Sequence, residues 1–498
     1  MSNIIYLPNG MEAIEAQYSN FPLAEFNENP FIQALPPLAD KSTMIKKMTV
    51  NPLFDEQERE ADAVYRLHMI NRLYQFYQPL PIHLRIWEMI HSLIMQGYLA
   101  RNPFDSNYVR YINETGKSII NRTYDINSRK NFRTTASAGT LIGFSGMGKT
   151  TSFNRVLSNI PQIIVHNEYR GQHFSQIQLV YLKLDAPPTS SLKALCLQFF
   201  MKVDELLGSN NYKKYVSRNM SVDSMLPLIG QLAHNIGLGL LVIDEIQNIR
   251  NKSGNQIMNF FVNLINSGVN LALIGTPSSY ELFSKELRLA RRLTGNSEII
   301  YNNMDYNEEF KFLLESMWKY QWTRKYTPIT EELAKVFYEE TQGISSLIVS
   351  LFVYSQQTAI QTGKEELTVE LVRKVAKEKF KLMREMLDAI RSGNPYKIMK
   401  YEDIRRLEEN STIQKTAYLN KKKERARDFE IKDEPKEEPK KVKENKMANS
   451  TVKQGNLEDD LRKLFNERKS VNKTPYELLL ESGNIDDMKL WIEGSQHA

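Results

Sequence analysis

One short stretch constrains the fold of this chain more than any other part of the sequence. Residues 143–150, Gly-Phe-Ser-Gly-Met-Gly-Lys-Thr, follow two aliphatic residues and precede a helical pattern, and they fit the phosphate-binding pattern G-x-x-x-x-G-K-[ST]. Glycines let a backbone wrap closely around a polyphosphate, and the following helix adds its positive end to the same anion. We therefore expect a strand–loop–helix unit that binds a nucleotide; the alternative is a plain glycine turn. The expected nucleotide-binding residues are Gly143, Ser145, Gly146, Gly148, Lys149, Thr150 and Thr151.

A second stretch supplies two carboxylates at a predicted strand end. Leu240-Leu-Val-Ile-Asp-Glu245 is apolar until its last two residues. Ligands of open parallel sheets bind at the carboxyl ends of the strands, so Asp244 is expected to hold Mg²⁺ together with the Thr150 hydroxyl. Glu245 is expected to polarise the attacking water as a general base. The alternative is an acidic pair that merely ends a strand.

The next apolar stretch ends in Gly-Thr-Pro, which places Thr276 where a hydroxyl would reach the γ-phosphate or the catalytic water. Three arginines follow within five residues, Arg288, Arg291 and Arg292. An arginine from a neighbouring subunit can neutralise the charge that develops during phosphoryl transfer. Arg291 or Arg292 is thus a candidate for such a finger. The alternatives are a strand-ending turn for Thr276 and a solvated or DNA-facing surface for the arginines.

Apolar runs and helical spacing alternate between residues 101 and 302, which predicts an α/β core with a parallel sheet and helices on both faces. We expect strands at residues 140–143, 162–166, 178–185, 238–244 and 270–275. We expect helices of this core at residues 191–206, 222–235 and 255–265.

The flanking segments differ from the core in pattern. Residues 1–60 are rich in proline but carry apolar anchors, which indicates an arm that packs on its own body or on a neighbouring subunit. Residues 61–100 indicate two helices, and 303–405 a helical lid with helices at 308–318, 329–341, 346–362 and 368–387. Residues 406–456 form a charged linker expected to be disordered, followed by a partner-docking segment at 457–498.

Composition excludes several classes of protein. Cys196 is the only cysteine of the 498 residues, so a disulfide framework and a zinc site built on several cysteines are excluded. The sequence lacks a charged-then-apolar leader and an apolar run near the length of a membrane span, so we expect a cytoplasmic protein with no membrane partner. The net charge of +6 permits a DNA partner without requiring one.

The order of phosphate loop, acidic strand, Gly-Thr-Pro strand, Arg-Arg turn and helical lid resembles an AAA+ ATPase. More narrowly, it is similar to the TnsC-type regulators of transposition, which are related to TniB and MuB. The stretches that support this narrower resemblance are 29–37, 143–151, 240–247, 273–277, 290–292 and 386–393, of which the first and the last are the specific part. The resemblance covers about residues 20–405 and, more weakly, 457–494.

This resemblance implies a bacterial, ATP- and Mg²⁺-dependent ATPase that assembles as a ring or filament on double-stranded DNA and disassembles on hydrolysis. It also implies two protein partners, a target-selector protein and transposase subunits that bind the C-terminal segment. One departure from the family pattern stands at residues 343–346, Gly-Ile-Ser-Ser, where many AAA+ lids carry an arginine. We therefore expect neighbouring subunits to complete the nucleotide site.

Contacts with DNA are expected to be with phosphates, through the segment inserted before the acidic strand. The candidates there are Lys202, Lys213, Lys214 and Arg218, and a second set is Arg250 and Lys252. The alternative for both sets is a solvated helix surface. Three other classes of function stay open: an initiator- or loader-like AAA+ ATPase, a secretion-associated motor, and a scaffold with inert nucleotide.

Overall fold

Five parallel strands in the order β6-β7-β8-β3-β9 form the sheet on which the predicted site depends. The computed structural model describes residues 3–121, 134–189, 191–216, 220–249, 254–279, 297–398 and 400–401. The five strands are β3 (Ala138–Gly143), β6 (Tyr181–Asp185), β7 (Leu240–Asp244), β8 (Leu271–Gly275) and β9 (Ser297–Tyr301). The apolar runs of β3, β7 and β8 are buried along their whole length, as expected for strands covered on both faces. The predicted parallel α/β sheet is confirmed.

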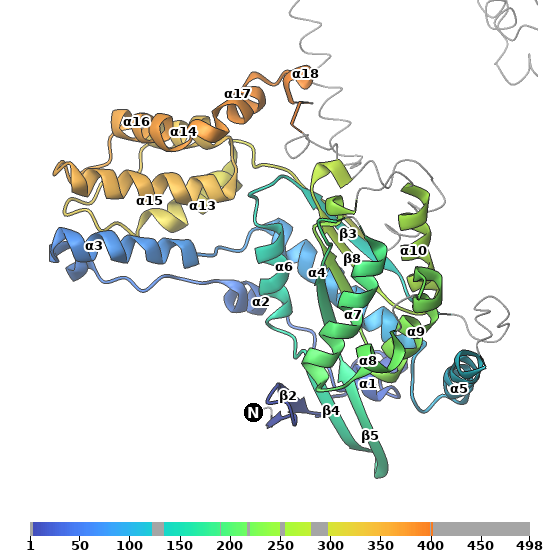
Figure 1. Cartoon of the computed structure of the whole chain (residues 1–498). Helices are drawn as coiled ribbons and strands as arrows, with labels where there is room; N and C mark the ends of the chain where they lie inside the picture. The colour runs from blue at the N-terminus through green and yellow to red at the C-terminus, as the bar shows by residue number, and fades with distance from the viewer. Residues whose placement is uncertain are drawn as a thin grey trace, which may run out of the picture. The chain divides into compact units, whose positions relative to one another are not determined.

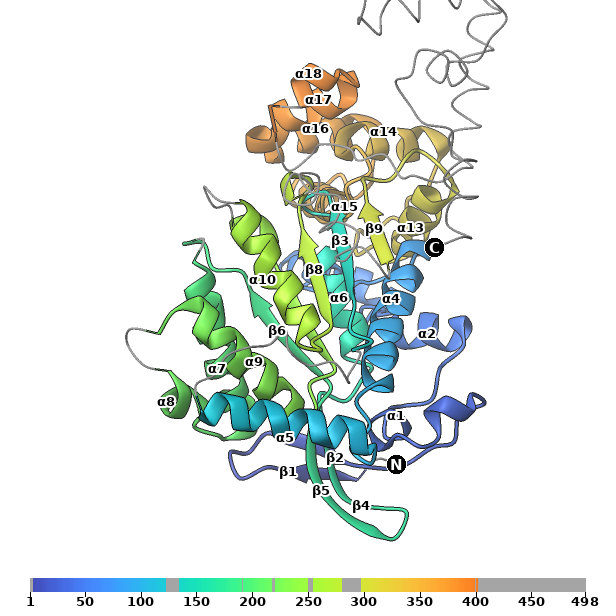
Figure 2. The ribbon, with the colours of Figure 1, turned by 90° about the vertical axis from the view of Figure 1, so that its right-hand side faces the viewer.

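Helices cover both faces of this sheet (Figure 2). One face packs against α4 (Pro81–Leu99) and α6 (Lys149–Leu157), and the other against α7 (Leu192–Leu207), α9 (Val222–Asn235) and α10 (Gly254–Asn266). Neighbouring residues of a strand point to opposite faces, so Leu141 joins the first apolar cluster and Ile142 the second.

A second sheet of four strands has the order β1-β2-β4-β5. Its strands are β1 (Ile4–Tyr6), β2 (Glu12–Glu15), β4 (Ile163–Tyr169) and β5 (Gln172–Leu179). The expectation of one strand over residues 178–185 is therefore wrong, because β5 ends in this sheet at Leu179 and β6 begins in the parallel sheet at Tyr181. The apolar run continues unbroken through this change of sheet, so periodicity alone does not reveal the break.

The N-terminal arm packs on the body of its own chain. Strand β2 pairs in parallel with β4, with Ile14 opposite Ile164. Helix α1 (Pro30–Gln33) begins after Asn29, whose side chain accepts a hydrogen bond from the Phe31 N–H and donates one to the Tyr98 carbonyl. Helix α2 (Lys41–Met48) also contacts α4. The arm was expected to pack either on its own body or on a neighbouring subunit, and its described residues pack on their own chain.

The two helical patterns between residues 61 and 100 contact different parts of the structure. Helix α3 (Ala63–Met69) and the 3₁₀ helix η3 (Ile70–Gln75) lie beside α15 of the lid, whereas α4 lies on the parallel sheet (Figure 1). The prolines before α4 do not interrupt it, because Pro81 takes its first position, where a missing N–H is tolerated. This segment therefore links the lid to the core.

Residues 303–398 are helical, with α13 (Glu308–Trp318), α14 (Glu331–Thr341), α15 (Ser345–Gln361), α16 (Val369–Lys379), α17 (Arg384–Ser392) and α18 (Pro395–Ile398). The single helix expected at 368–387 is wrong: it is split by the 3₁₀ helix η6 (Lys381–Met383). There Phe380 is buried and ends α16, while Leu382 is 98% exposed.

The remaining elements connect these layers. They are α5 (Ser106–Ile120), α8 (Asn211–Tyr215), η1 (Ala24–Phe26), η2 (Glu56–Glu60), η4 (Ile246–Asn248) and η5 (Pro277–Ser279). The chain divides into a unit over Met1–Gln414 and a second unit over Lys415–Ala498, and the second lies outside the described residues. The expected linker at 406–456 and docking segment at 457–498 are therefore not described, and the expected domain boundaries remain predictions.

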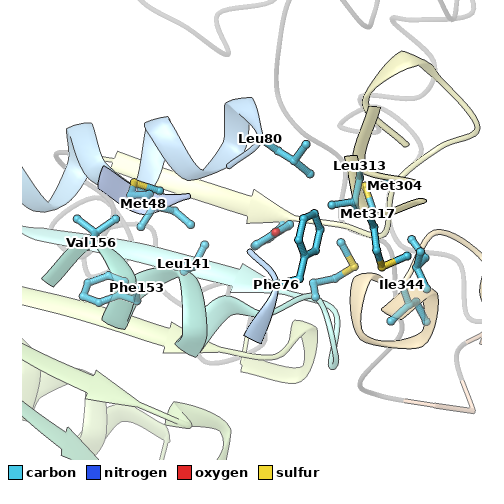
Figure 3. Close-up of a cluster of buried hydrophobic side chains, with 14 of the residues drawn as sticks. Met48, Phe76, Leu80, Leu141, Phe153, Val156, Met304, Leu313, Met317 and Ile344 are labelled. Carbon is cyan, nitrogen blue, oxygen red and sulfur yellow. The ribbon is translucent and has the colours of Figure 1, made fainter. Parts of the chain in front are cut away.

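One apolar cluster continues from the sheet into the lid. Figure 3 shows Phe153 and Val156 of α6 at one end, Phe76 in the middle, and Met317 and Ile344 of the lid at the other. Among the described helices, none has the length and apolar character that crossing a membrane requires.

Candidate functional site

The loop between β3 and α6 has a backbone that requires its glycines. Gly146 and Gly148 have φ angles of +80° and +85°, in the left-handed region that other residues rarely adopt. A Cβ atom on Gly143 would lie 2.1 Å from the Tyr301 carbonyl oxygen, so this position has no room for a side chain. The loop residues Ser145 and Gly146 are exposed, as is Thr151 in the first turn of α6.

Lys149 is the first residue of α6 and points back over the loop. Its Nζ donates to the Gly143 carbonyl oxygen at 2.9 Å and to the Phe144 carbonyl oxygen at 2.8 Å. The N-terminal N–H groups of a helix lack partners within the helix and favour an anion. An ammonium group, a left-handed glycine loop and a helix N-terminus thus meet at one place, an arrangement that fits the phosphates of a nucleotide.

Thr150 and Asp244 are in direct contact across the sheet. The Thr150 hydroxyl donates to Asp244 Oδ2 at 2.8 Å, and Asp244, the last residue of β7, is 2% exposed. A hydroxyl and a carboxylate are hard oxygen ligands of the kind that Mg²⁺ takes alongside substrate phosphates. These two residues therefore present oxygen ligands that fit a Mg²⁺ ion, and the predicted metal site remains a prediction.

Glu245 follows in a strained backbone conformation, with φ 55° and ψ 39°. Its N–H donates to Asp244 Oδ1 at 2.9 Å, and its side chain is exposed. The Gln247 amide nitrogen donates to Glu245 Oε2, and the Gln247 amide oxygen accepts from the Thr276 N–H at 3.1 Å. Gln247 thus joins the carboxylate after β7 to the backbone after β8.

Thr276 directly follows β8 and is 6% exposed. Its hydroxyl lies 2.8 Å from the Ser278 hydroxyl. Thr150, Asp244, Glu245 and Thr276 therefore all lie at the carboxyl edge of the sheet, where the chain's predicted catalytic groups were expected to meet.

Two buried side chains, His83 and Tyr301, form a hydrogen-bonded pair beside the loop. His83 Nε2 lies 2.7 Å from the Tyr301 hydroxyl, and the Tyr301 carbonyl accepts the Phe144 N–H at 3.0 Å. Burial lowers the pKa of His83 to about 4 and raises that of Tyr301. The side chains of His83 and Tyr301 are thus both neutral near pH 7 and contribute no charge to the site.

The lid reaches the phosphate loop without an arginine. The Ser346 N–H, at the start of α15, donates to the Gly146 carbonyl at 3.1 Å, and a Cβ on Gly146 would lie 2.7 Å from Ser346 Oγ. Gly343, with φ +69°, has no room for a side chain beside the Met304 backbone. The lid segment at residues 343–346, which contains no arginine, therefore contacts the loop directly.

Sequence reasoning missed Lys183 on the neighbouring strand β6. Its Nζ lies 3.0 Å from Asp244 Oδ2 and donates to Asn154 Oδ1 of α6 at 3.1 Å. The signal was a lysine between two leucines in a short strand, on the same face as the strand-ending carboxylate. Gln247 was quoted within a motif but was given no role.

The candidate fingers Arg291 and Arg292, with Arg288, lie outside the described residues. So do the candidate DNA contacts Arg218, Arg250 and Lys252.

The described candidates for DNA contact lie away from the nucleotide site. Helix α7 begins after the carboxyl end of β6 and runs back along the sheet, so α8 at its end lies toward the opposite edge. Lys202 pairs with Glu205 at 2.8 Å, and Lys214 Nζ lies 4.9 Å from the centre of the Tyr215 ring. Lys213 and Lys214 are exposed on α8.

Comparison with known proteins gives one match to a family. Residues 132–283 match the family model AAA_22, described as an AAA domain. Among curated proteins, none matches the chain.

Three solved structures are similar to the chain at low identity. The Aeropyrum pernix ORC1 protein in complex with DNA has 14% identity and a TM-score of 0.33, and the alignment covers 62% of this chain and 82% of that chain. Drosophila ORC bound to DNA has 11% identity and a TM-score of 0.33, with 78% and 92% covered. Domain III of the Thermotoga maritima replication initiation protein DnaA has 14% identity and a TM-score of 0.28, with 56% and 94% covered.

The matched residues contain the β3–α6 loop and both carboxylates after β7. Residues 132–283 are therefore similar to an AAA domain, and the chain has the α/β fold of the AAA+ P-loop ATPases.

Proposed function

We propose that this chain is an ATP-dependent, DNA-binding regulator of transposition that oligomerises on target DNA and links target-site selection to transposase recruitment. The observation that carries the ATPase part is the contact between Thr150 and Asp244 beside the Lys149 ammonium. Together these residues present one cation, one hydroxyl and one carboxylate to a loop shaped for phosphates. The transposition part rests on the resemblance to the TnsC-type regulators.

In this proposal the loop glycines and the N-terminus of α6 hold the phosphates of ATP. Lys149 exchanges the Gly143 and Phe144 carbonyl oxygens for the outer phosphates. Mg²⁺, held by Thr150 and Asp244, would neutralise charge on the phosphates. Ser145 and Thr151 complete the contacts of the loop with the nucleotide.

Glu245 polarises the attacking water as general base, and Gln247 orients its carboxylate. Thr276, at the end of the next strand, contacts the γ-phosphate or the water. Because an exposed carboxylate activates water only once solvent is excluded, hydrolysis awaits a neighbouring subunit that covers Glu245.

That neighbour contributes Arg291 or Arg292 to the γ-phosphate. The proposal is supported by the lid, where Ser345 and Ser346 stand in place of a nucleotide-binding arginine. The lid segment at residues 343–346 supplies no arginine to the nucleotide, so an arginine from the neighbouring subunit would have a large effect on the rate of hydrolysis. Such an arginine finger accelerates hydrolysis about 10³–10⁵-fold. ATP thus favours the ring or filament on DNA, and hydrolysis dissolves it.

Double-stranded DNA is contacted through its phosphates. The proposed contacts are Lys202, Lys213, Lys214, Arg218, Arg250 and Lys252. Exposed lysines beside an aromatic ring on α8 support the first group. The linker at 406–456 would tether the segment at 457–498, which binds transposase subunits, and a target-selector protein acts at an earlier step.

The decisive test compares ATP hydrolysis with and without duplex DNA. We expect ATP-dependent DNA binding, a regular assembly on DNA and DNA-stimulated hydrolysis, all lost in Lys149→Ala. A matched control is Lys335→Ala, an exposed lysine on α14. Hydrolysis that is indifferent to DNA, with no ATP-dependent DNA binding, would contradict the proposal and favour an AAA+ ATPase of another class.

Two further variants separate the parts of the proposal. Glu245→Gln keeps the nucleotide but slows hydrolysis, so the assembly on DNA should persist, whereas Glu332→Gln on α14 should behave as the native chain. Removal of residues 448–498 should leave hydrolysis intact and weaken transposase recruitment. Rapid disassembly of the first variant, or unchanged recruitment by the second, counts against the corresponding role.

A further inference from the structure

The predicted metal ligand Asp244 already carries a cation from its own chain. Lys183 Nζ lies 3.0 Å from Asp244 Oδ2, the same oxygen that accepts the Thr150 hydroxyl at 2.8 Å. The other oxygen, Oδ1, accepts the Glu245 N–H at 2.9 Å. Both oxygens of this carboxylate are thus engaged by the protein itself.

The fold holds the lysine at this place. Strand β6 lies beside β7 with Asp185 opposite Asp244, and alternation along the strand puts Lys183 on the same face as Asp244. On that face α6 presents Asn154, which accepts a second hydrogen bond from Lys183 Nζ at 3.1 Å. The Lys183 side chain is 23% exposed and that of Asp244 is 3% exposed, so the lysine retains an open path to solvent.

A hydrated Mg²⁺ ion and an ammonium group need the same carboxylate oxygens. Mg²⁺ takes hard oxygen ligands and keeps several waters, so the ion or its hydration shell would compete with the Lys183 ammonium for Asp244 Oδ2. Two cations at one carboxylate also repel each other strongly where solvent is largely excluded. Lys183 would therefore oppose binding of the metal for as long as it remains at Asp244.

We propose that Lys183 competes with Mg²⁺ for Asp244, so that it raises the Mg²⁺ concentration at which the site retains ATP. This inference rests on the proposed nucleotide site and adds a residue that sets its metal requirement. Without metal, the lysine keeps the buried carboxylate neutralised; with nucleotide and metal, it withdraws along its exposed side. Lys183 acts here as a positioning residue, because it acts through Asp244.

The test measures retention of N-methylanthraniloyl-ATP by the full chain while free Mg²⁺ is varied. In Lys183→Met, which keeps the length of the side chain but removes its charge, half-maximal retention should occur at a Mg²⁺ concentration lower by on the order of tenfold, as for loss of one charge-assisted hydrogen bond. Lys183→Arg keeps the cation and should keep a high Mg²⁺ requirement. Mn²⁺ binding to the nucleotide-loaded chain, followed by electron paramagnetic resonance, should show the same order of variants.

A matched control is Lys311→Met. Lys311 forms a comparable ion pair with Glu331 in the lid, at 3.1 Å and with its side chain 29% exposed, and the variant should follow the native Mg²⁺ curve. Thermal unfolding of each variant checks that the chain remains folded.

The outcomes separate this inference from the proposed function. If the native chain fails to retain the nucleotide at any Mg²⁺ concentration, the proposed nucleotide site and the competition by Lys183 are both refuted. If it retains the nucleotide and Lys183→Met has the native Mg²⁺ midpoint, the competition is refuted while the nucleotide site stands. A higher midpoint in Lys183→Met would also refute it, because Lys183 would then bind the phosphates.

Discussion

Two ion pairs join distant parts of this chain, and they are built in different ways. At the base of the lid, the Arg66 guanidinium binds Glu365 through two hydrogen bonds of 2.8 and 2.7 Å and also donates to the Ala61 and Trp322 carbonyls. At the edge of the sheet, Lys183 reaches Asp244 through one contact of 3.0 Å. The Arg66 side chain is 1% exposed, whereas that of Lys183 is 23% exposed.

The difference separates a permanent contact from an exchangeable one. Each of the three guanidinium nitrogens of Arg66 donates to a fixed acceptor, so the group cannot leave its buried place without leaving these acceptors unpaired. The partly exposed Lys183, held by Asp244 and by one hydrogen bond to Asn154, can turn into water at a smaller cost, because its ammonium is readily hydrated. The first pair therefore ties the N-terminal segment to the lid, and the second leaves the carboxylate of the proposed metal site open to exchange.

The largest expected effect comes from the permanent pair. Arg66→Ala leaves Glu365 and two carbonyls without their donor and should lower the free energy of unfolding by about 3–5 kcal/mol. Denaturant unfolding measures this, with Arg373→Ala as the control, since Arg373 pairs with Glu339 at the surface and should cost less than about 1 kcal/mol. Equal losses of unfolding free energy in Arg66→Ala and Arg373→Ala would mean that the buried pair is no more stabilising than the surface pair.

The lid's contact with the loop can be tested separately from its base. Gly146→Ala adds a Cβ atom 2.7 Å from Ser346 Oγ at a residue with φ +80°, and it should weaken nucleotide binding and cost about 1–2 kcal/mol or more. Gly171→Ala is the matched control, because Gly171 has φ +77° but open space around it. The loss of unfolding free energy in Gly146→Ala beyond that in Gly171→Ala measures the effect of the contact with Ser346 of the lid. Equal losses would mean that the lid does not contact the loop closely at Gly146.

Acid should weaken the permanent pair in a defined direction. The hydrogen bonds from Arg66 hold the pKa of Glu365 below its ordinary value of 4.5. The folded chain therefore binds this proton less readily than the unfolded one, so the pair's contribution is complete above about pH 4.5 and is lost as pH falls through the lowered pKa.

The check compares the unfolding free energy of the native chain with that of Glu365→Gln as the pH is lowered. The advantage of the native chain over the variant should be constant near neutral pH and should shrink in acid. An advantage that grows as pH falls would mean that the glutamate is protonated more readily in the folded chain.

The smallest effect on stability is expected at the exchangeable pair. Lys183→Met removes the cation beside a buried carboxylate but leaves Asp244 with the Thr150 hydroxyl and the Glu245 N–H, so the free energy of unfolding should fall by about 1–2 kcal/mol, less than in Arg66→Ala. Thermal or denaturant unfolding of Lys183→Met beside Arg66→Ala measures the contrast. A loss at Lys183 as large as that at Arg66 would show that the pair is structural and does not exchange.

Much of the parallel sheet and of the site was accessible from sequence because the signals are local. Thr150 and Asp244 were expected to meet because one begins a helix after a strand and the other ends a strand, and both places lie at the carboxyl edge of a parallel sheet. The lid helices α13 and α14 were foreseen nearly to the residue, since helical spacing is regular and each begins after a capping side chain, Asn307 and Thr330.

The elements and contacts that the sequence did not predict depend mostly on pairings between segments far apart in the chain. Strands β1, β2 and β9 are short, and β2 pairs both with β1 and with β4, which lies about 150 residues away in the chain. The break between β5 and β6 lies inside a continuous apolar run, which alternation cannot divide. The bond between Arg66 and Glu365 likewise depends on how α3 meets the lid, and nothing near either residue indicates it.

The sequence by itself determined which groups the candidate site contains, because the loop glycines, Lys149, Thr150 and the two carboxylates belong to motifs that are local in the chain. Only the tertiary structure decided what surrounds that chemistry: Ser346 on the loop, Gln247 between Glu245 and Thr276, and Lys183 on Asp244. These contacts depend on strand order and register, which long-range packing selects and no single segment encodes.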